Sequence, residues 1–189
     1  MWTMLNSERT ERLLETAISA LAADDGSAVL DALPAPIYTT DADGRVTYWN
    51  QACIDFAGRE PQLGEDRWCV TWQLYTMTGE GLPHDECPMA KAIKEKRAVR
   101  GEIAIALRPD GSRVAFKPYP TPLFDTDGKL TGAINMLIDI SDEQSEALKD
   151  QAARCRRLAS ATHDDRTGDL LKTMATAYEE TAAALHQAA

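Results

Sequence analysis

The chain has 189 residues, a formal net charge of −10 at pH 7 and a sequence pI of about 4.8. Such a surface repels a phosphate backbone, and no block of Lys and Arg favours an acidic membrane, so we expect neither nucleic acid nor a membrane as a partner. No apolar run is long enough to cross a bilayer, and residues 1–12 lack the basic-then-apolar order of a signal peptide. These features predict a cytoplasmic protein.

The cysteines are scattered and form no Cys-x-x-Cys pair; they are Cys53, Cys69, Cys87 and Cys155. In a reducing compartment such cysteines are expected to be free thiols. A zinc site is not expected either. His84 and Cys87 supply only two ligands, and adding Cys69 still leaves a closed tetrahedral site incomplete.

Two helices are predicted before the first strand. The first is residues 7–23: Ser7 is its candidate N-cap, and its apolar side chains recur on one helical face. Residues 28–33 form a short second helix, which Pro34 and Pro36 end.

Asp-Gly steps at 43–44, 110–111 and 127–128 predict tight reversals between antiparallel strands. The expected strands are residues 37–40, 46–49, 103–108, 114–118 and 130–140. Asn50 is a candidate N-cap for a short helix. Residues 117–122 contain three prolines, which cannot donate to a central ladder, so this segment is expected to leave the sheet.

Helices are expected in the middle of the chain and throughout its last part. Residues 88–96 form a helix with Pro88 in its first turn. Residues 142–161 form another, with apolar residues at Leu148, Ala152, Cys155 and Leu158. A last helix carries Leu171, Met174, Tyr178 and Leu185 at heptad-like spacing, so the two C-terminal helices read as a hairpin. Because these amphipathic stripes need a partner, a homodimer through the N-terminal or C-terminal helices is expected.

Several segments together resemble a PAS domain, a sensory fold common in bacterial signalling proteins. Residues 33–41 with 44–46 resemble its first hairpin, and Tyr48-Trp49-Asn50 resembles the step into its next helix. Residues 108–112 resemble its central hairpin, and residues 132–141, ending in Asp-Ile-Ser, resemble its closing strand. The tail from Cys155 to Leu185 is similar to short helical tails of small proteobacterial proteins.

The resemblance implies an α+β fold: a five-stranded antiparallel sheet with a helical crossover, an N-terminal helix and a C-terminal helical hairpin. The expected divisions are 1–29 for the helical region, 30–141 for the PAS domain and 142–189 for the hairpin. Asp139, Ile140 and Ser141 would then be the exit through which the sheet passes a signal to the next helix. Asp139 would bond near the strand end, and Ser141 would cap the helix.

Large apolar side chains are candidates to face the concave side of the sheet. They would line a small-molecule pocket or simply fill a packed core. The pocket candidates are Trp68, Trp72, Tyr75, Met77, Met89, Ile93, Ile105, Phe116, Ile134 and Met136.

Haem is one cofactor alternative, because His84 lies near the helix where haem-binding PAS domains place their axial histidine, and Cys87-Pro88 matches a short haem-regulatory motif. Since His84 precedes that helix, a helix-start role is favoured over iron ligation. The light-sensing flavin branch of the family needs a reactive cysteine in an Asn-Cys-Arg-Phe-type motif. Cys53 and Cys69 lack that context, so flavin photochemistry is not expected, and the cofactor stays unassigned.

His163 begins a His-Asp-Asp-Arg-Thr run similar to the phosphoacceptor box of sensor histidine kinases. Asp165 and Gly168 depart from that box, and no Gly-rich phosphate cradle is present, so a polar turn is the simpler interpretation. With no nucleophile-base set either, we expect no enzyme. The predicted function is a sensory module that binds a ligand or signalling protein and relays it through the C-terminal helices. The alternatives are a cofactor-free adaptor and a phosphotransfer or kinase-remnant protein using His163.

Overall fold

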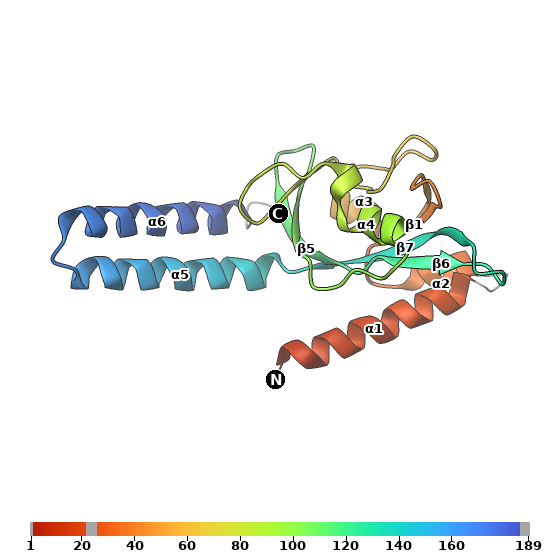
Figure 1. Ribbon diagram of the computed structural model, residues 1–189, viewed down its shortest axis with the longest axis horizontal. Helices are drawn as coiled ribbons and strands as arrows, with labels where there is room; N and C mark the ends of the chain where they lie inside the picture. Colours follow the sequence, from red (N-terminus) through yellow and green to blue (C-terminus); the bar gives the residue numbers. More distant parts are fainter. Residues whose placement is uncertain (1, 22–25, 186–189) are drawn as a thin grey trace.

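The computed structural model describes residues 2–21 and 26–185, and one antiparallel sheet organises them (Figure 1). Its strand order is β2-β1-β7-β5-β4-β3, and β6 pairs with β7 off this path. The strands are β1 Ile37–Asp41, β2 Val46–Trp49, β3 Gln73–Tyr75, β4 Ala104–Leu107, β5 Arg113–Pro118, β6 Thr121–Phe124 and β7 Leu130–Asp139. The expected α+β class is confirmed, with β7 at the centre of the sheet.

Helices cover both faces of this sheet, and two more extend away from it. They are α1 Trp2–Leu21, α2 Gly26–Ala32, α3 Gln51–Ala57, the 3-10 turn η1 His84–Glu86, α4 Pro88–Glu95, α5 Ser141–Ala161 and α6 Asp165–Ala184. Figure 1 shows α3 and α4 over one face, here called the inner face, and α1 and α2 under the opposite, outer face. The α5–α6 hairpin projects from one end of the sheet.

The proline-rich segment does not leave the sheet as expected. After a break at Tyr119 and Pro120, the chain returns as β6, which pairs with β7 at Thr121↔Ile134 and Pro122↔Ala133. Among the residues that the structure describes, β6 pairs with β7 alone, so Pro122 occupies an edge, where its missing N–H is tolerated. β3 and β6 thus extend the expected five strands to seven.

The inner face carries the main hydrophobic core. Phe56 of α3 meets Phe116 of β5 edge to face, with ring centroids 5.3 Å apart. Met89 and Ile93 of α4 pack into the same cluster, together with Leu137 of β7. This close packing holds α3 and α4 onto the sheet.

The outer face has a separate core beneath α1 and α2. Leu14 and Ala17 of α1 pack with Ile134 and Met136 of β7, and Leu30 of α2 belongs to the same cluster. All five are at most 1% exposed. The apolar stripe of α1 is therefore buried against the sheet.

Asn50 ties these layers together. Its Oδ1 accepts from the backbone N–H groups of Ile37, at 3.0 Å, and Cys53, at 3.2 Å. Its Nδ2 donates to the carbonyls of Leu30, at 3.1 Å, and Ala35, at 2.9 Å. The predicted N-cap of α3 is confirmed, and the same side chain also fastens α2 to β1.

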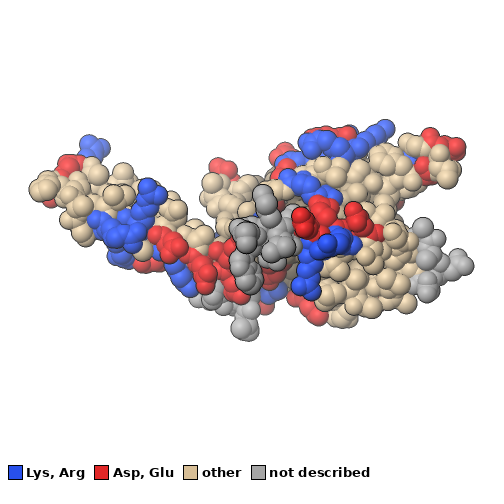
Figure 2. Space-filling model, turned by 90° about the horizontal axis from the view of Figure 1, so that it is seen from below, with Lys and Arg blue, Asp and Glu red and all other residues tan. Residues whose placement is uncertain are grey.

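The hairpin is held by a narrow seam. Ala152 and Cys155 of α5 pack against Ala175 of α6, and Leu171 and Tyr178 flank them. Leu158 and Met174 were expected on the apolar stripes of these helices, but they are 50% and 38% exposed. Small residues form the contact between the helices instead. Figure 2 shows Lys and Arg gathered on the outer part of the hairpin, with acidic side chains nearer the sheet.

Candidate functional site

The exit, residues 139–141, is where β7 passes directly into α5. The backbone N–H of Ile140 donates to the Ala115 carbonyl at 2.8 Å, which ties the exit to β5. The Asp139 Oδ1 accepts from the Ser141 N–H at 2.8 Å, as expected for a bond near the strand end. Ser141 is not the N-cap: it is the first residue of α5, and its Oγ accepts from the Ala115 N–H at 3.1 Å.

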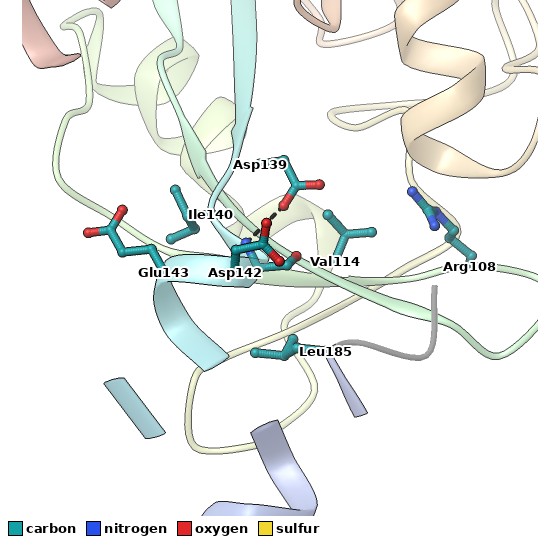
Figure 3. Close-up of a pocket in the computed structure, with 8 residues that line it drawn as sticks. Arg108, Val114, Asp139, Ile140, Asp142, Glu143 and Leu185 are labelled. Atoms are coloured by element: carbon teal, nitrogen blue, oxygen red, sulfur yellow. Dashed lines mark hydrogen bonds between the residues drawn. The ribbon is translucent and has the colours of Figure 1, made fainter. Parts of the chain in front are cut away.

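A hollow of about 520 Å³ lies at this junction (Figure 3). Its lining comes from β4–β5, the exit and both ends of the hairpin: Arg108, Val114, Asp139, Ile140, Ser141, Asp142, Glu143 and Leu185. Leu185, which follows α6, packs with Ile105, Ala115 and Ile140, so the start of α5 and the end of α6 meet the sheet at one place.

A second hollow, of about 450 Å³, adjoins the exit on the side of α1 and shares Asp139, Ile140 and Glu143 with the first. Arg100 lies in it, with its Nε donating to Glu11 of α1 at 2.7 Å. Arg100 also donates to the Pro120 carbonyl at 3.0 Å. This ion pair anchors α1 beside the exit.

β7 also carries a polar group into the inner core. The Asn135 Nδ2 donates to the Tyr38 hydroxyl at 3.1 Å, and that hydroxyl donates to the Trp68 carbonyl at 2.9 Å. The Tyr119 N–H donates to the Asn135 Oδ1 at 2.9 Å. Complete burial raises the pKa of Tyr38 well above its ordinary value, so the hydroxyl keeps its proton. One strand thus joins this network to the exit.

Trp68 closes the other end of the network. Its φ is +70°, a left-handed conformation that costs a bulky residue roughly 1–2 kcal/mol. The Trp68 N–H donates to the Gly44 carbonyl at 2.7 Å. The Arg67 guanidinium lies 4.9 Å and the Lys94 ammonium 5.7 Å from the centre of the indole ring. Contacts on several sides therefore hold a strained residue beside Tyr38.

Comparison with known families identifies this arrangement. The family described as "PAS fold" matches residues 30–145, more than half of the chain. The chain belongs to the PAS family. A search of curated proteins finds no match.

Solved PAS-type structures resemble the chain in fold. An RNA-binding light-oxygen-voltage receptor superposes with a TM-score of 0.50 at 22% identity, covering 65% of this chain and 34% of that one. The LOV domain of a blue-light-activated histidine kinase from Erythrobacter litoralis gives 0.44 at 23% identity, covering 57% and 97%. The LOV protein of Rhodobacter sphaeroides gives 0.46 at 13% identity, covering 92% and 98%. The chain thus spans about a third of the length of the first.

The pocket candidates are divided between the two faces of the PAS sheet. Met89, Ile93 and Phe116 belong to the inner core, with half-buried Trp68 against it. Ile134 and Met136 lie instead in the outer core under α1, and Ile105 lies in the cluster at the hairpin base with Tyr75 and Met77. These outer residues depart from the expected concave placement because successive side chains of a strand alternate between faces.

Trp72 and Tyr75 meet His84 in a shallow hollow of about 340 Å³ along β3. Trp72 is 47% exposed there. His84 stands in η1, ahead of α4, as its sequence position indicated, and partial burial lowers its pKa. Within residues 2–21 and 26–185, no three His, Cys, Asp or Glu side chains are placed to hold a metal ion.

All four cysteines of the PAS protein are free and buried. Burial raises the pKa of Cys87 to about 12, and it raises the pKa values of Cys53 and Cys69 as well. These thiols therefore stay protonated at neutral pH. Cys155 forms part of the hairpin seam.

His163 lies in the turn between α5 and α6 and is exposed. Asp164 beside it caps α6, accepting from the Thr167 N–H at 2.9 Å. This is the polar turn that the sequence favoured.

The sequence predicts the junction between strand and helix at residues 139–141, where β7 ends and α5 begins, but it does not single out Tyr38, Asn135 or Arg100. Asn135 carried a signal, since it is the lone amide in the apolar run 133–138. A polar side chain at the centre of a buried strand needs a partner. Tyr38 and Arg100 stand in ordinary sequence surroundings.

Proposed function

We propose that the chain is a cytoplasmic sensory module without catalytic activity, which binds a small ligand or a signalling protein through its PAS domain. The response would pass along β7 to the exit and into the C-terminal hairpin. The observation that carries this proposal is that β7 holds Asn135 in the inner core and ends at the exit. A change at Trp68 or Tyr38 would thereby reach α5 by a short route, through the hydrogen bonds to Asn135 and then along the backbone of β7.

Other features support the same assignment. In the part of the chain that the structure describes, no helix is long and apolar enough to cross a membrane. The net charge of −10 argues against a nucleic acid partner. The strain at Trp68 supports a sensing role for the inner core, because a ligand that moved this residue would release stored energy.

The relay is tested by removing one hydroxyl. Tyr38→Phe deletes the link between Trp68 and Asn135, so amide hydrogen exchange in the first turns of α5 should become about fivefold faster, equivalent to about 1 kcal/mol of lost hydrogen bonding. Exchange is read by mass spectrometry on the full chain.

Tyr48→Phe is the matched control. It also removes one tyrosine hydroxyl, here bonded to the Asp31 Oδ1 of α2 at 2.6 Å and not to a residue of β7. Unchanged exchange of α5 in Tyr38→Phe, or equal acceleration in both variants, would contradict the relay.

A ligand-binding sensor and a cofactor-free adaptor differ in what the purified protein carries. A native mass above 20.7 kDa per chain, or absorption beyond the aromatic band, would indicate a bound small molecule. For the adaptor, the expected result is the bare chain mass with a featureless spectrum above the Trp absorption.

A further inference from the structure

The outer part of the α5–α6 hairpin exposes three large apolar side chains. Leu158 of α5 is 50% exposed, and Leu170 and Met174 of α6 are 61% and 38% exposed. All three lie in the halves of α5 and α6 nearer the turn that joins these helices, and the hairpin projects from the sheet (Figure 1). Isolated exposed leucines are ordinary, but three gathered at one end of a projecting element indicate a contact surface.

These side chains share one side of the hairpin. In α6, Leu170 and Met174 each directly precede a seam residue, Leu171 and Ala175. Since successive residues turn by about 100°, both side chains stand on the same side of the α5–α6 seam, and Leu158 of α5 stands on that side as well. The Arg156–Glu179 ion pair, with Nε to Oε1 at 2.9 Å, spans the opposite side. We name the first side the apolar face; it consists of Leu158, Leu170, Met174 and Ala177.

We propose that the apolar face docks against the same face of a second copy, with the two hairpin tips side by side, to form a four-helix bundle. This rests on the proposed function and deepens it by naming the partner at the receiving end of the relay. The N-terminal helix is the less suitable surface, because Leu14, Ala17 and Ala20 of α1 are already buried against the sheet.

The available area fits a second copy. Helices of about 20 residues are about 30 Å long and roughly 10 Å wide, so one side of the hairpin offers about 600 Å². Two such faces bury about 1,200 Å² in total, which reaches the lower range of specific protein interfaces. Tips side by side also bring both apolar clusters together, whereas opposed tips on fully overlapped hairpins would offset them by roughly 10–15 Å.

The charges along the margins are complementary in this arrangement. A two-fold axis along the bundle sets α5 beside α6 of the partner copy. By helical spacing, the outward margin of α5 carries Arg154 and Arg157, and that of α6 carries Glu180. Neither arginine has an ion-pair partner among the residues that the structure describes, so both remain available to Glu180 of the partner copy.

The oligomeric state of the full chain tests the proposal. By light scattering and sedimentation equilibrium at micromolar concentration, the native chain should be a dimer. Leu170→Glu should raise the dimer dissociation constant at least tenfold, because it places a charge in each half of an apolar contact. Leu63→Glu is the matched control, since Leu63 is 63% exposed but lies in the α3–β3 loop.

A monomeric native chain would overturn the proposal, as would a Leu170→Glu dimer of unchanged affinity or an equal loss in Leu63→Glu. Circular dichroism of each variant confirms that it is folded. These outcomes leave the proposed relay standing, because its exchange readout in Tyr38→Phe does not depend on the dissociation constant.

A cross-link tests the orientation separately. Met174→Cys should form an interchain disulfide on mild oxidation, since two copies of this position approach the two-fold axis. Lys172→Cys, on the side of the ion pair, should not, and the buried native thiols provide a low background. A dimer in which Lys172→Cys cross-links and Met174→Cys does not would overturn the assigned face.

Discussion

Asn50→Ala is expected to lower the free energy of unfolding by roughly 3–5 kcal/mol, because each buried polar group left without a partner costs about 1–3 kcal/mol. Asn50 is only 1% exposed, and both its oxygen and its amino group are fully engaged. Alanine would leave the Ile37 N–H and the Ala35 carbonyl without partners in the interior, and the Leu30 carbonyl would keep only the Leu33 N–H as a donor. Urea unfolding followed by circular dichroism measures the loss.

The neighbouring Gln51→Ala is the control. Gln51 is exposed, and its Nε2 donates only to the Asp55 Oδ1, at 3.1 Å. This change should stay within about 0.5 kcal/mol of the native stability. Similar losses in the two variants would show that the helix start, rather than the buried network, limits stability.

Gly132→Ala is expected to lower the free energy of unfolding by at least about 3 kcal/mol, or to prevent folding. The added methyl group has no room, because the backbone of β1 packs directly against this position. A Cβ at Gly132 would lie 1.9 Å from the carbonyl oxygen of Thr40. Gly132 stands opposite Asp41 in the β1–β7 ladder, so relief requires separating the two strands. Thermal and urea unfolding of the purified variant measure the effect.

Gly81→Ala separates this contact from the general cost of replacing glycine. An added Cβ at Gly81 meets nothing within 4 Å. Neither glycine is among those with positive φ, so backbone strain does not distinguish them. Near-native stability of Gly132→Ala would contradict the close approach of β1 and β7.

The turns were predictable because glycine is chemically distinctive there. Gly44, Gly111 and Gly128 all adopt positive φ, at 83°, 89° and 75°, as the Asp-Gly steps indicated. These three positions mark the turns between β1 and β2, between β4 and β5, and between β6 and β7, whereas β3 adjoins none of them.

Which side chains of β7 point to the inner face and which to the outer face was not predictable in the same way. A strand at the centre of a sheet is buried on both sides, so residues 133–138 show no alternation between apolar and polar positions. The sequence therefore predicts Ile134 and Met136 on the concave side, whereas they lie under α1. The amide of Asn135 was the one marker of the inner side.

The role of Ser141 also depended on tertiary contacts. A serine before a helix suggests an N-cap. In the structure, however, the Ser141 hydroxyl oxygen accepts a hydrogen bond from the Ala115 N–H of the neighbouring strand β5. Such competition between a local and a long-range partner is decided by the fold and leaves no trace in the local sequence.

The two ends of the hairpin meet the sheet at one place, where Ile140 and Leu185 pack together. A rod anchored only at its base acts as a lever. Since each arm is about 30 Å long, a tilt of about 5° at the base would carry the tip roughly 2.5 Å. A shift in β7 too small to break a single hydrogen bond would thus become a displacement as large as half a helical turn at the far end of the molecule.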